Sequence, residues 1–326
     1  MPLKVHFLNV GQGDCTIIEF PSGRVAMVDI DNLGILDPDT AREVLEEYGR
    51  SVEYLVAKAL GGDVAREARE FFRKRYAPLT DPLAYYDTHI GRWREIFRLL
   101  ITHPDMDHMT GLYRLYEQER RQILNFWHTG FHDFNLADAS WEGSPYDERD
   151  WEVYKRLRAG LAGSPKSLQL YQGSIGNYWT EDGVEIWAPT PDLERLAVDK
   201  DAPNILSMVV RISYAGQSIV LGGDATAEES WPAIAAAGMV RRVAVLKASH
   251  HGRKSGYYGP AVKAMAPWLT ITSVAEAEHD ATESYRRYSR YTVSLRKAGD
   301  IQITIADDGT WYYSPNVEEH WKPQTS

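Results

Sequence analysis

Residues 96–112, IFRLLITHPDMDHMTGL, join an apolar run to a loop with four potential metal ligands, namely His103, Asp105, Asp107 and His108. The run IFRLLI predicts a buried β-strand. The proline after His103 disfavours a helix there, so the four side chains are expected in a loop. In a loop the first two can point one way and the last two another, which suits two cations about 3.5–4 Å apart. A polar turn with a helix cap is the alternative, but this density of ligand types favours a metal site.

Three further polar clusters follow apolar runs. In SIVLGGD, Asp224 is a metal ligand, the N-cap of a helix over the following ATAEES, or both. In VAVLKASHHG, the adjacent His250 and His251 are more typical of ligands delivered from a strand end than of core histidines. In RVAMVDID, Asp29 and Asp31 either support a site or satisfy backbone groups in a turn. The basic side chains beside the histidine pair, which could contact a phosphate, are Lys247, Arg253 and Lys254.

Short β-rich runs separated by turn signals make up most of the remaining chain. They lie at residues 3–10, 15–20, 24–30, 97–102, 123–127, 184–189, 206–214, 218–224, 242–249, 268–274 and 301–314. Helical patterns lie at residues 40–75, 111–122, 148–157, 226–238 and 257–267. Two sets of strands, each followed by helices, predict an α/β sandwich of two sheets with helices outside. We expect one domain over residues 1–326, with insertions at about 32–95 and 130–165.

The chain has 326 residues and a net charge of −10, with 44% hydrophobic and 11% aromatic residues. This composition is typical of a folded globule with a sizeable core. The acidic balance excludes a strongly basic nucleic-acid coat but not a local basic groove. The single cysteine, Cys15, excludes an intrachain disulfide and a Cys-rich zinc site, and we expect it in the core. Because no signal peptide and no apolar run of ~20 residues is present, we expect a soluble cytoplasmic protein without a membrane partner.

Four motifs taken together resemble those of the metallo-β-lactamase-fold hydrolases. VGQGD, HPDMDH, GGD and HHG occur in that order, and the likeness spans nearly the whole chain outside the two insertions. The sequence is most similar to the C-terminal hydrolase domain of the DNA-uptake channel protein ComEC. The resemblance implies an αββα sandwich with a two-metal site, and it implies that Asp29 orients the ligands. The ligands that it implies are His103, Asp105, Asp107, His108, Asp224 and either His250 or His251.

The chain departs from that family in two places. Many members have a second histidine where this chain has Asp105, and a further histidine before the strand that leads to the bridging aspartate. The latter region reads DAPNILSMVV here and offers Asn204 and Ser207 as supports instead. More oxygen ligands shift the preference from Zn²⁺ towards Mn²⁺ or Mg²⁺ and weaken the second site, so we expect one or two divalent ions. We also expect a free-standing relative without the channel role.

These observations predict a divalent-metal-dependent hydrolase, most simply a phosphodiesterase or nuclease acting on DNA or RNA. Asp107 would orient the attacking water or accept its proton. Lys247, Arg253 or Lys254 would stabilise the charged transition state. Nucleic acid as the substrate follows from the resemblance alone. The Tyr- and Arg-rich residues 283–297 could stack on bases and contact phosphates, or they form an amphipathic helix with a solvated basic face.

Two other functions stay open at this point. A hydrolase of small phosphodiesters, such as cyclic nucleotides or phosphocholine esters, would have a deep pocket roofed by the insertions and lined by Trp127, Trp141 and Trp151. A non-catalytic binding protein on this scaffold would explain the missing histidine and would hold no metal. The sequence does not identify protein partners.

Overall fold

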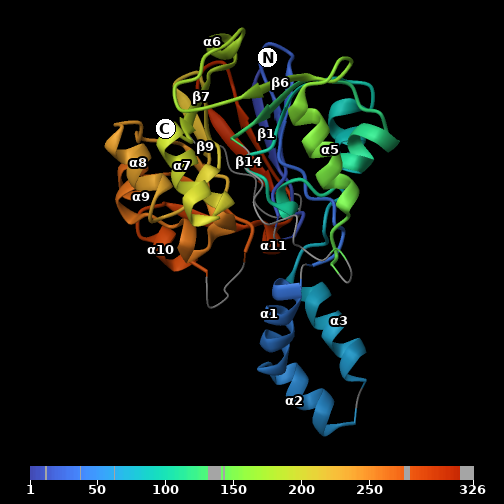
Figure 1. The fold of residues 1–326 in the computed structure, drawn as a ribbon. Coiled ribbons are helices and arrows are strands. Elements are labelled where there is room, and N and C mark those ends of the chain that lie inside the picture. The colour runs from blue at the N-terminus through green and yellow to red at the C-terminus, as the bar shows by residue number, and fades with distance from the viewer. Residues whose placement is uncertain are drawn as a thin grey trace.

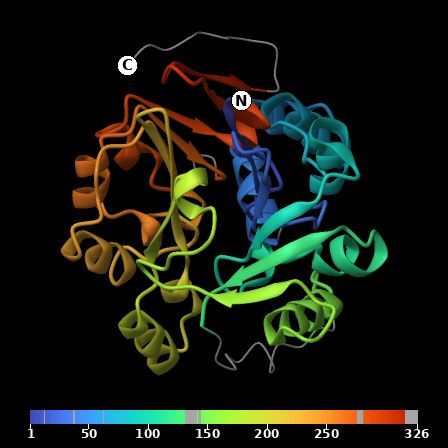
Figure 2. The same cartoon turned by 90° about the horizontal axis from the view of Figure 1, so that it is seen from above.

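Two β-sheets packed face to face form the centre of the computed structural model, and helices cover their outer faces (Figure 1, Figure 2). The structure describes residues 1–11, 13–36, 38–61, 63–130, 141, 144–274 and 280–315. The chain is therefore an α/β protein with the predicted αββα sandwich. Within the described residues, no helix is long and apolar enough to cross a membrane.

In the described part of the chain, one sheet has the strand order β14-β13-β1-β2-β3-β4-β5-β6 and the other β12-β11-β10-β9-β8-β7. The strands of the first sheet are β1 Leu3–Phe7, β2 Thr16–Glu19, β3 Val25–Val28, β4 Ile96–Leu100, β5 Ile123–His128, β6 Lys166–Gln169, β13 Ile301–Ile305 and β14 Trp311–Pro315. Those of the second are β7 Val184–Ala188, β8 Val209–Tyr214, β9 Gln217–Leu221, β10 Val245–Lys247, β11 Leu269–Thr272 and β12 Tyr291–Ser294. Neighbouring strands from β3 to β6 run parallel, as do those from β9 to β12, so each set ends at a common edge.

Helices fill the connections between these strands. The longer ones are α1 Pro38–Gly49, α2 Val52–Ala59, α3 Val64–Arg75, α5 Glu148–Ala159, α7 Pro191–Lys200, α8 Ser230–Ala236 and α9 Gly259–Met265. The shorter ones are α4 Pro82–Tyr86, η1 Asp87–Gly91, η2 Met106–His108, η3 Arg114–Gln118, α6 Trp179–Asp182, η5 Pro203–Leu206, η6 His250–Gly252, η7 Lys254–Gly256, α10 Thr282–Arg286 and α11 Leu295–Ala298.

Three buried clusters fill the three interfaces between the four layers. The cluster between the two sheets includes Ile219 and Val245. A second cluster packs the outer face of the first sheet against α4, η3 and α5; it includes Leu99 and the predicted core residue Cys15. A third packs the second sheet against α8, α9 and α10 and includes Val262. The alternation of side chains along each strand supplies apolar groups to both faces of the sheets, as a fold with buried sheets requires.

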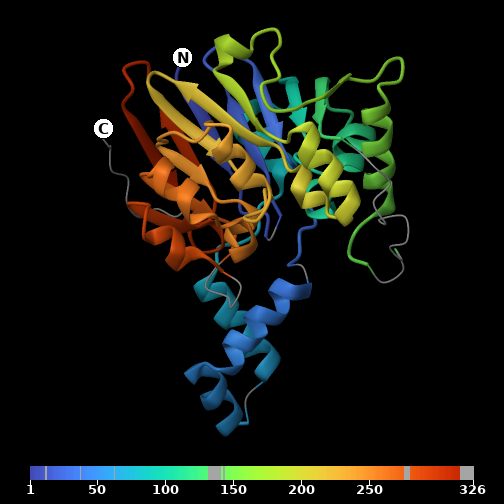
Figure 3. The same cartoon turned by 60° about the vertical axis from the view of Figure 1, so that its left-hand side comes forward.

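Helices α1, α2 and α3 project from the sandwich as an arm (Figure 1, Figure 3). The aromatic ring of Tyr48 packs against those of Tyr54 and Phe71, with centroids 5.5 and 5.3 Å apart. At the base of the arm, Thr80 Oγ1 donates to the carboxylate of Asp300 at 2.8 Å. The arm occupies the first predicted insertion, between β3 and β4, and its helical content agrees with the pattern of residues 40–75.

The basic stretch at residues 283–297 differs from the expected amphipathic helix. Helix α10 ends at Arg286, and Tyr291–Ser294 form the edge strand β12, paired parallel with β11. The β-branched Thr292 and Val293 favour this pairing because such side chains suit a pleated, half-buried surface. Strand β6 and helix α7 also form where we predicted no element. In the second predicted insertion, residues 131–140, 142 and 143 lie outside the described residues, and the single-domain organisation stays a prediction.

A buried ion pair links the first sheet to α6, which leads into the second. Arg98 Nη1 donates to Asp182 Oδ2 at 2.6 Å, and Arg98 is 1% exposed. Asp182 also accepts hydrogen bonds from Arg24 Nε at 2.9 Å and Ser22 Oγ at 2.7 Å. The carboxylate thus neutralises a guanidinium that no water reaches, since both side chains are fully buried.

We predict that Asp182→Asn lowers the free energy of unfolding by about 3–5 kcal/mol, because the buried charge of Arg98 loses its counter-ion. Urea unfolding measures the change. The exposed Asp199→Asn in α7 is the matched control and should change stability by less than about 0.5 kcal/mol. If Asp182→Asn lowers the free energy of unfolding by less than about 1 kcal/mol, the ion pair does not contribute the predicted stability.

The buried side chain of His128, at the end of β5, should make the fold less stable at acidic pH. Its Nε2 lies 3.0 Å from Ser167 Oγ and its Nδ1 2.8 Å from Thr129 O. Burial lowers the pKa of His128 from 6.5 to about 4. Between these values the unfolded chain binds a proton that the folded chain does not, so stability falls as the pH falls, by up to roughly 3 kcal/mol.

Replacing His128 by glutamine should therefore flatten the pH dependence of the unfolding free energy. Urea unfolding of both proteins at about pH 7 and about pH 4.5 measures the two slopes. Equal slopes in the wild type and His128→Gln would contradict the assignment, whatever the absolute stability of the variant.

Candidate metal centre

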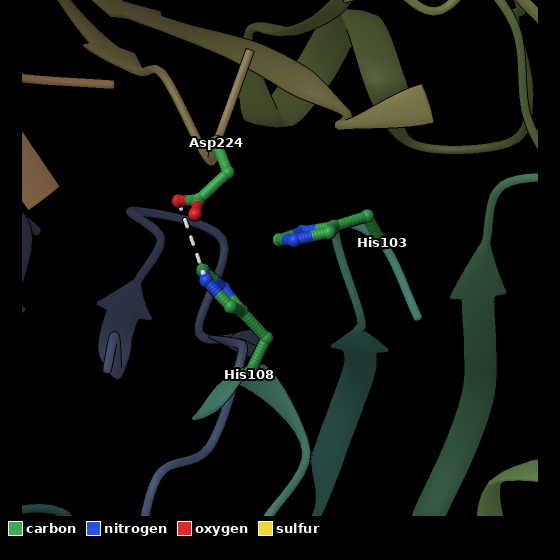
Figure 4. A group of neighbouring side chains, drawn as sticks. All are labelled: His103, His108 and Asp224. Carbon is green, nitrogen blue, oxygen red and sulfur yellow. Dashed lines mark ion pairs between the residues drawn. The ribbon is translucent and has the colours of Figure 1, made fainter. Parts of the chain in front are cut away.

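The candidate site lies at the edge where parallel strands of both sheets end. Asp29 follows β3, His103 and His108 follow β4, Asp224 follows β9 and His251 follows β10. Figure 4 shows the side chains of His103, His108 and Asp224 pointing toward one another. Because loops at such an edge are held by rigid strands, they can fix several side chains in one place.

Three overlapping groups of side chains among the described residues could hold a metal ion, with ligand atoms within 4.8 Å of one another. The groups are His103 with His108 and Asp224, Asp107 with His108 and His251, and Asp14 with Asp224 and His251. The structure therefore brings together five side chains that the sequence singled out as candidate ligands. It adds a sixth, Asp14, which we did not predict as a ligand.

Several ligand atoms in these groups are buried without hydrogen-bond partners. They are Nε2 of His103, Nε2 of His108, Oδ1 of Asp224 and Nδ1 of His251. Two of these atoms, His108 Nε2 and Asp224 Oδ1, face each other at 3.3 Å without a hydrogen bond, and His103 Nε2 has no partner at all. A buried polar atom left unsatisfied costs about 1–3 kcal/mol, so this gathering needs an explanation. A divalent cation bound by imidazole nitrogen and carboxylate oxygen would supply one, and this donor set fits such an ion.

Asp29 orients His108 and fixes the start of the motif loop. Its Oδ2 accepts a hydrogen bond from His108 Nδ1 at 2.8 Å, and its Oδ1 accepts one from Thr102 N at 2.7 Å. Nε2 of His108 is thereby directed to Asp224 Oδ1, 3.3 Å away. The backbone of Asp29 has φ 56°, a left-handed conformation that a non-glycine residue seldom adopts. A carboxylate behind a histidine in this way sets its tautomer and its direction.

His103 is fully buried between two hydroxyl groups and the centre. Its Nδ1 lies 3.4 Å from Ser207 Oγ, so its Nε2 is the ring nitrogen that does not face this hydroxyl. Burial, followed by the nearby His108, lowers the pKa of His103 to about 3, so the ring is neutral and keeps a lone pair. Ser207 Oγ also accepts a hydrogen bond from Asp224 N at 2.6 Å, whereas Asn204 contributes its backbone carbonyl to Ser207 N.

Asp224 lies at the middle of the cluster. Its Oδ1 approaches His108, and its Oδ2 lies 3.3 Å from His251 Nε2 and 3.7 Å from His250 Nε2. Although burial alone would raise it, the pKa of Asp224 is held well below its usual range by His251 and His108. The N-cap alternative was wrong, because helix α8 begins only at Ser230.

The two adjacent histidines differ in what they reach. His251 is fully buried, with Nε2 3.1 Å from Asp107 Oδ2, and it belongs to two of the three groups. The side chain of His250 is 22% exposed, and its Nδ1 lies 2.8 Å from Ser255 Oγ. Both have left-handed backbones, with φ 51° for His250 and 61° for His251. Such conformations cost about 1–3 kcal/mol each and are typical of functional loops.

The VGQGD loop supplies the residue that the sequence analysis missed. Asp14 Oδ1 accepts hydrogen bonds from Lys247 Nζ at 2.6 Å and Ser273 Oγ at 2.9 Å, and it lies 3.6 Å from His251 Nδ1. A Cβ added at Gly13 would come within 2.2 Å of Asp107 O, so only glycine allows the loop to approach this closely. The glycines around Asp14 were a signal of such an approach.

The remaining predicted site residues lie around the centre. Asp105 caps η2 through Met106 N at 2.8 Å and belongs to none of the three groups, and burial followed by Asp107 raises its pKa to about 7. Arg253 is half-buried and Lys254 exposed, both in the loop after His251. Their roles, and that of Lys247, stay predictions.

The chain has distant likenesses among proteins of known structure. No protein-family model matches the chain, and no curated protein matches it. Among solved structures it is similar to Igni18, a novel metallo hydrolase from the hyperthermophilic archaeon Ignicoccus hospitalis, at 12% identity and TM-score 0.46 over 93% of this chain and 99% of that one. It is also similar to CmlA, a diiron β-hydroxylase from Streptomyces venezuelae, at 14% identity and TM-score 0.46 over 93% and 54%.

A mutant of CmlA β-hydroxylase is similar at 14% identity and TM-score 0.47, over 93% of this chain and 53% of that one. This chain thus spans about half the length of the CmlA chains. At TM-scores below 0.5 these likenesses do not indicate an activity for this chain.

Asp29→Asn should lower the affinity for Mn²⁺ or Zn²⁺ about 10- to 100-fold, because His108 loses the carboxylate that directs it. Isothermal titration calorimetry measures the dissociation constants, and Asp199→Asn serves again as the distant control. Unchanged affinity in Asp29→Asn would show that His108 is held by other contacts.

Proposed function

We propose that this protein is a divalent-metal-dependent hydrolase that cleaves phosphodiester bonds, with nucleic acid as its substrate. The observation that carries the proposal is the meeting of three imidazoles and two carboxylates at one edge of the sandwich, with buried ligand atoms that lack partners. Those five side chains are His103, Asp107, His108, Asp224 and His251. The sequence likeness to the ComEC hydrolase domain supports the same reading.

The metal would be held by these imidazoles and carboxylates, with Asp224 shared between groups. When bound, a divalent cation supplies Lewis-acid chemistry: it polarises a phosphoryl oxygen and lowers the pKa of water. The mixture of nitrogen and oxygen ligands suits Mn²⁺ or Zn²⁺, and Mg²⁺ is the third choice.

Asp107 is the candidate base. Its side chain is 14% exposed, more than those of the other carboxylates in the three groups, so it can reach a water molecule that enters from solvent. Burial alone would raise its pKa, but His108 and His251 lower the pKa of Asp107 to about 2. The carboxylate is therefore ionised at neutral pH and can accept the proton of the attacking water.

Basic side chains beside the centre favour an extended, polyanionic substrate. The backbone of Arg253 forms a bridge with Asp280, which joins the histidine loop to the start of α10. The basic residues of the histidine loop are Arg253 and Lys254, and Lys254 is exposed. A nucleic acid that enters the centre would place a neighbouring phosphate near these two side chains. We propose that action on nucleic acid takes place in the cytoplasm.

The three tryptophans that were expected to line a pocket for a small phosphodiester lie in different parts of the structure. Trp127 packs between the two sheets, whereas Trp141 and Trp151 belong to the outer cluster under α5. The three tryptophans therefore do not line one pocket.

Asp107→Ala should lower Mn²⁺-dependent cleavage of labelled single- or double-stranded DNA by about 10²–10⁴-fold, the usual contribution of a general base. The assay compares it with wild type and with the exposed Asp199→Ala, purified and loaded identically. Metal content measured on the same samples separates loss of the base from loss of the ion.

Three results would redirect the proposal. Wild-type protein that binds metal but leaves DNA and RNA intact would exclude a nuclease and turn attention to bis(p-nitrophenyl) phosphate as a small substrate. Equal cleavage by wild type and Asp107→Ala would point to a contaminating nuclease. Wild-type protein that binds no metal would favour the non-catalytic alternative.

A further inference from the structure

We propose that the buried ammonium group of Lys247 is a built-in cation that occupies the Asp14 side of the centre, so that the site holds one divalent ion and not two. This inference rests on the proposed function, because it assumes that the centre binds metal. It assigns Lys247 a positioning role inside the protein in place of the phosphate contact expected from the sequence.

The strand pattern of β10 carries Lys247 into the interior. Val245 belongs to the cluster between the sheets and Leu246 to the cluster under the outer helices. Side chains alternate along a strand, so Lys247 returns to the space between the sheets. It is 3% exposed. A lysine usually extends its charged end to water, but here the first sheet covers this face of the second sheet, and the side chain stays buried.

The contact between Lys247 and Asp14 is short and well supported. Lys247 Nζ donates to Asp14 Oδ1 at 2.6 Å, and Ser273 Oγ donates to the same oxygen at 2.9 Å. The Asp14 carboxylate therefore already has a buried counter-ion in place.

Asp14 cannot easily turn away from this contact. Its backbone N donates to Asp107 O at 3.4 Å, and a Cβ at Gly13 would clash with both Asp107 and Asp31. The loop is thus packed directly on the metal-binding motif. A cation bound to Asp14 would lie close to the ammonium of Lys247, and two like charges in a poorly solvated space repel strongly.

The position of His108 points to a single ion in the other two groups. Both groups contain His108, and its Nδ1 is already bonded to Asp29 Oδ2 at 2.8 Å. One ring nitrogen is therefore left, and it can bind one ion only.

This arrangement determines which of the candidate groups would bind the ion. The ion would bind at one of the two groups that contain His108. The third group, Asp14 with Asp224 and His251, would stay without a divalent ion as long as position 247 is cationic. Removing that charge while keeping the length of the side chain should open it.

The test counts bound ions in four proteins: wild type, Lys247→Met, Lys247→Arg and the double variant Lys247→Met with Asp14→Asn. Each is freed of metal, dialysed to equilibrium against Mn²⁺, and analysed by inductively coupled plasma mass spectrometry. Methionine is chosen because it fills a similar volume with an unbranched, adaptable chain. Thermal unfolding followed by circular dichroism checks that each variant is folded.

We expect one ion per chain in wild type and Lys247→Arg, two in Lys247→Met, and one in the double variant, because the last has neither the lysine nor the carboxylate. Electron paramagnetic resonance provides a second readout, since two adjacent Mn²⁺ ions couple and a single ion does not. A coupled signal is expected in Lys247→Met alone.

Two ions in wild type, or one in a folded Lys247→Met, would overturn the inference and leave the proposed function standing. Two ions in the double variant would place the additional ion away from Asp14 and would also overturn it. No ion in any of the four proteins would overturn the proposed function together with the inference. If Lys247→Met fails to fold without metal, the count is taken after refolding in Mn²⁺, and the double variant serves as the folded reference.

Discussion

Negative charge buried at one edge of the sandwich has to be compensated, and the site is arranged around that requirement. Asp14, Asp107 and Asp224 lie among side chains that water scarcely reaches. These carboxylates change the pKa values of His108 and His251. Burial alone would lower the pKa of each ring, but the surrounding carboxylates, Asp224 first, raise both pKa values well above the usual range. An environment that holds protons this tightly on imidazoles also attracts metal cations, which compete for the same lone pairs.

The histidine pair and Asp29 show how much backbone strain the arrangement contains. All three have left-handed conformations, and the loops that hold them are short and anchored to strands. Asp29 N donates to Leu100 O at 2.8 Å, so the strained residue continues the pairing of β3 with β4. The strain is stable because the ladder on each side fixes it, and the result is a set of side chains aimed at one point.

The ordered motifs made the layers and most of the centre predictable from the sequence. Apolar runs ending in His103, Asp224 or the histidine pair describe strands whose ends meet, and the structure has those strands. The role of Asp14 was not predictable in this way, because its partner Lys247 is 233 residues away and no local pattern reports such a contact. Strand β12 was missed because charged and aromatic residues around Thr292 resemble a helix face, and only pairing with β11 decides the matter.

The candidate metal centre also lies between the two sheets and takes side chains from both. His103, Asp107 and His108 come from the half of the chain that builds most of the first sheet, and Asp224 and His251 come from the half that builds the second. Neither half carries a complete set of ligands, and the Arg98–Asp182 pair lies across the same division. An ion bound there would therefore link the two sheets, and it would stabilise the folded chain because only the folded chain offers the whole ligand set. A chain with only one sheet folded would lack part of that set, so bound metal would report that both sheets have come together.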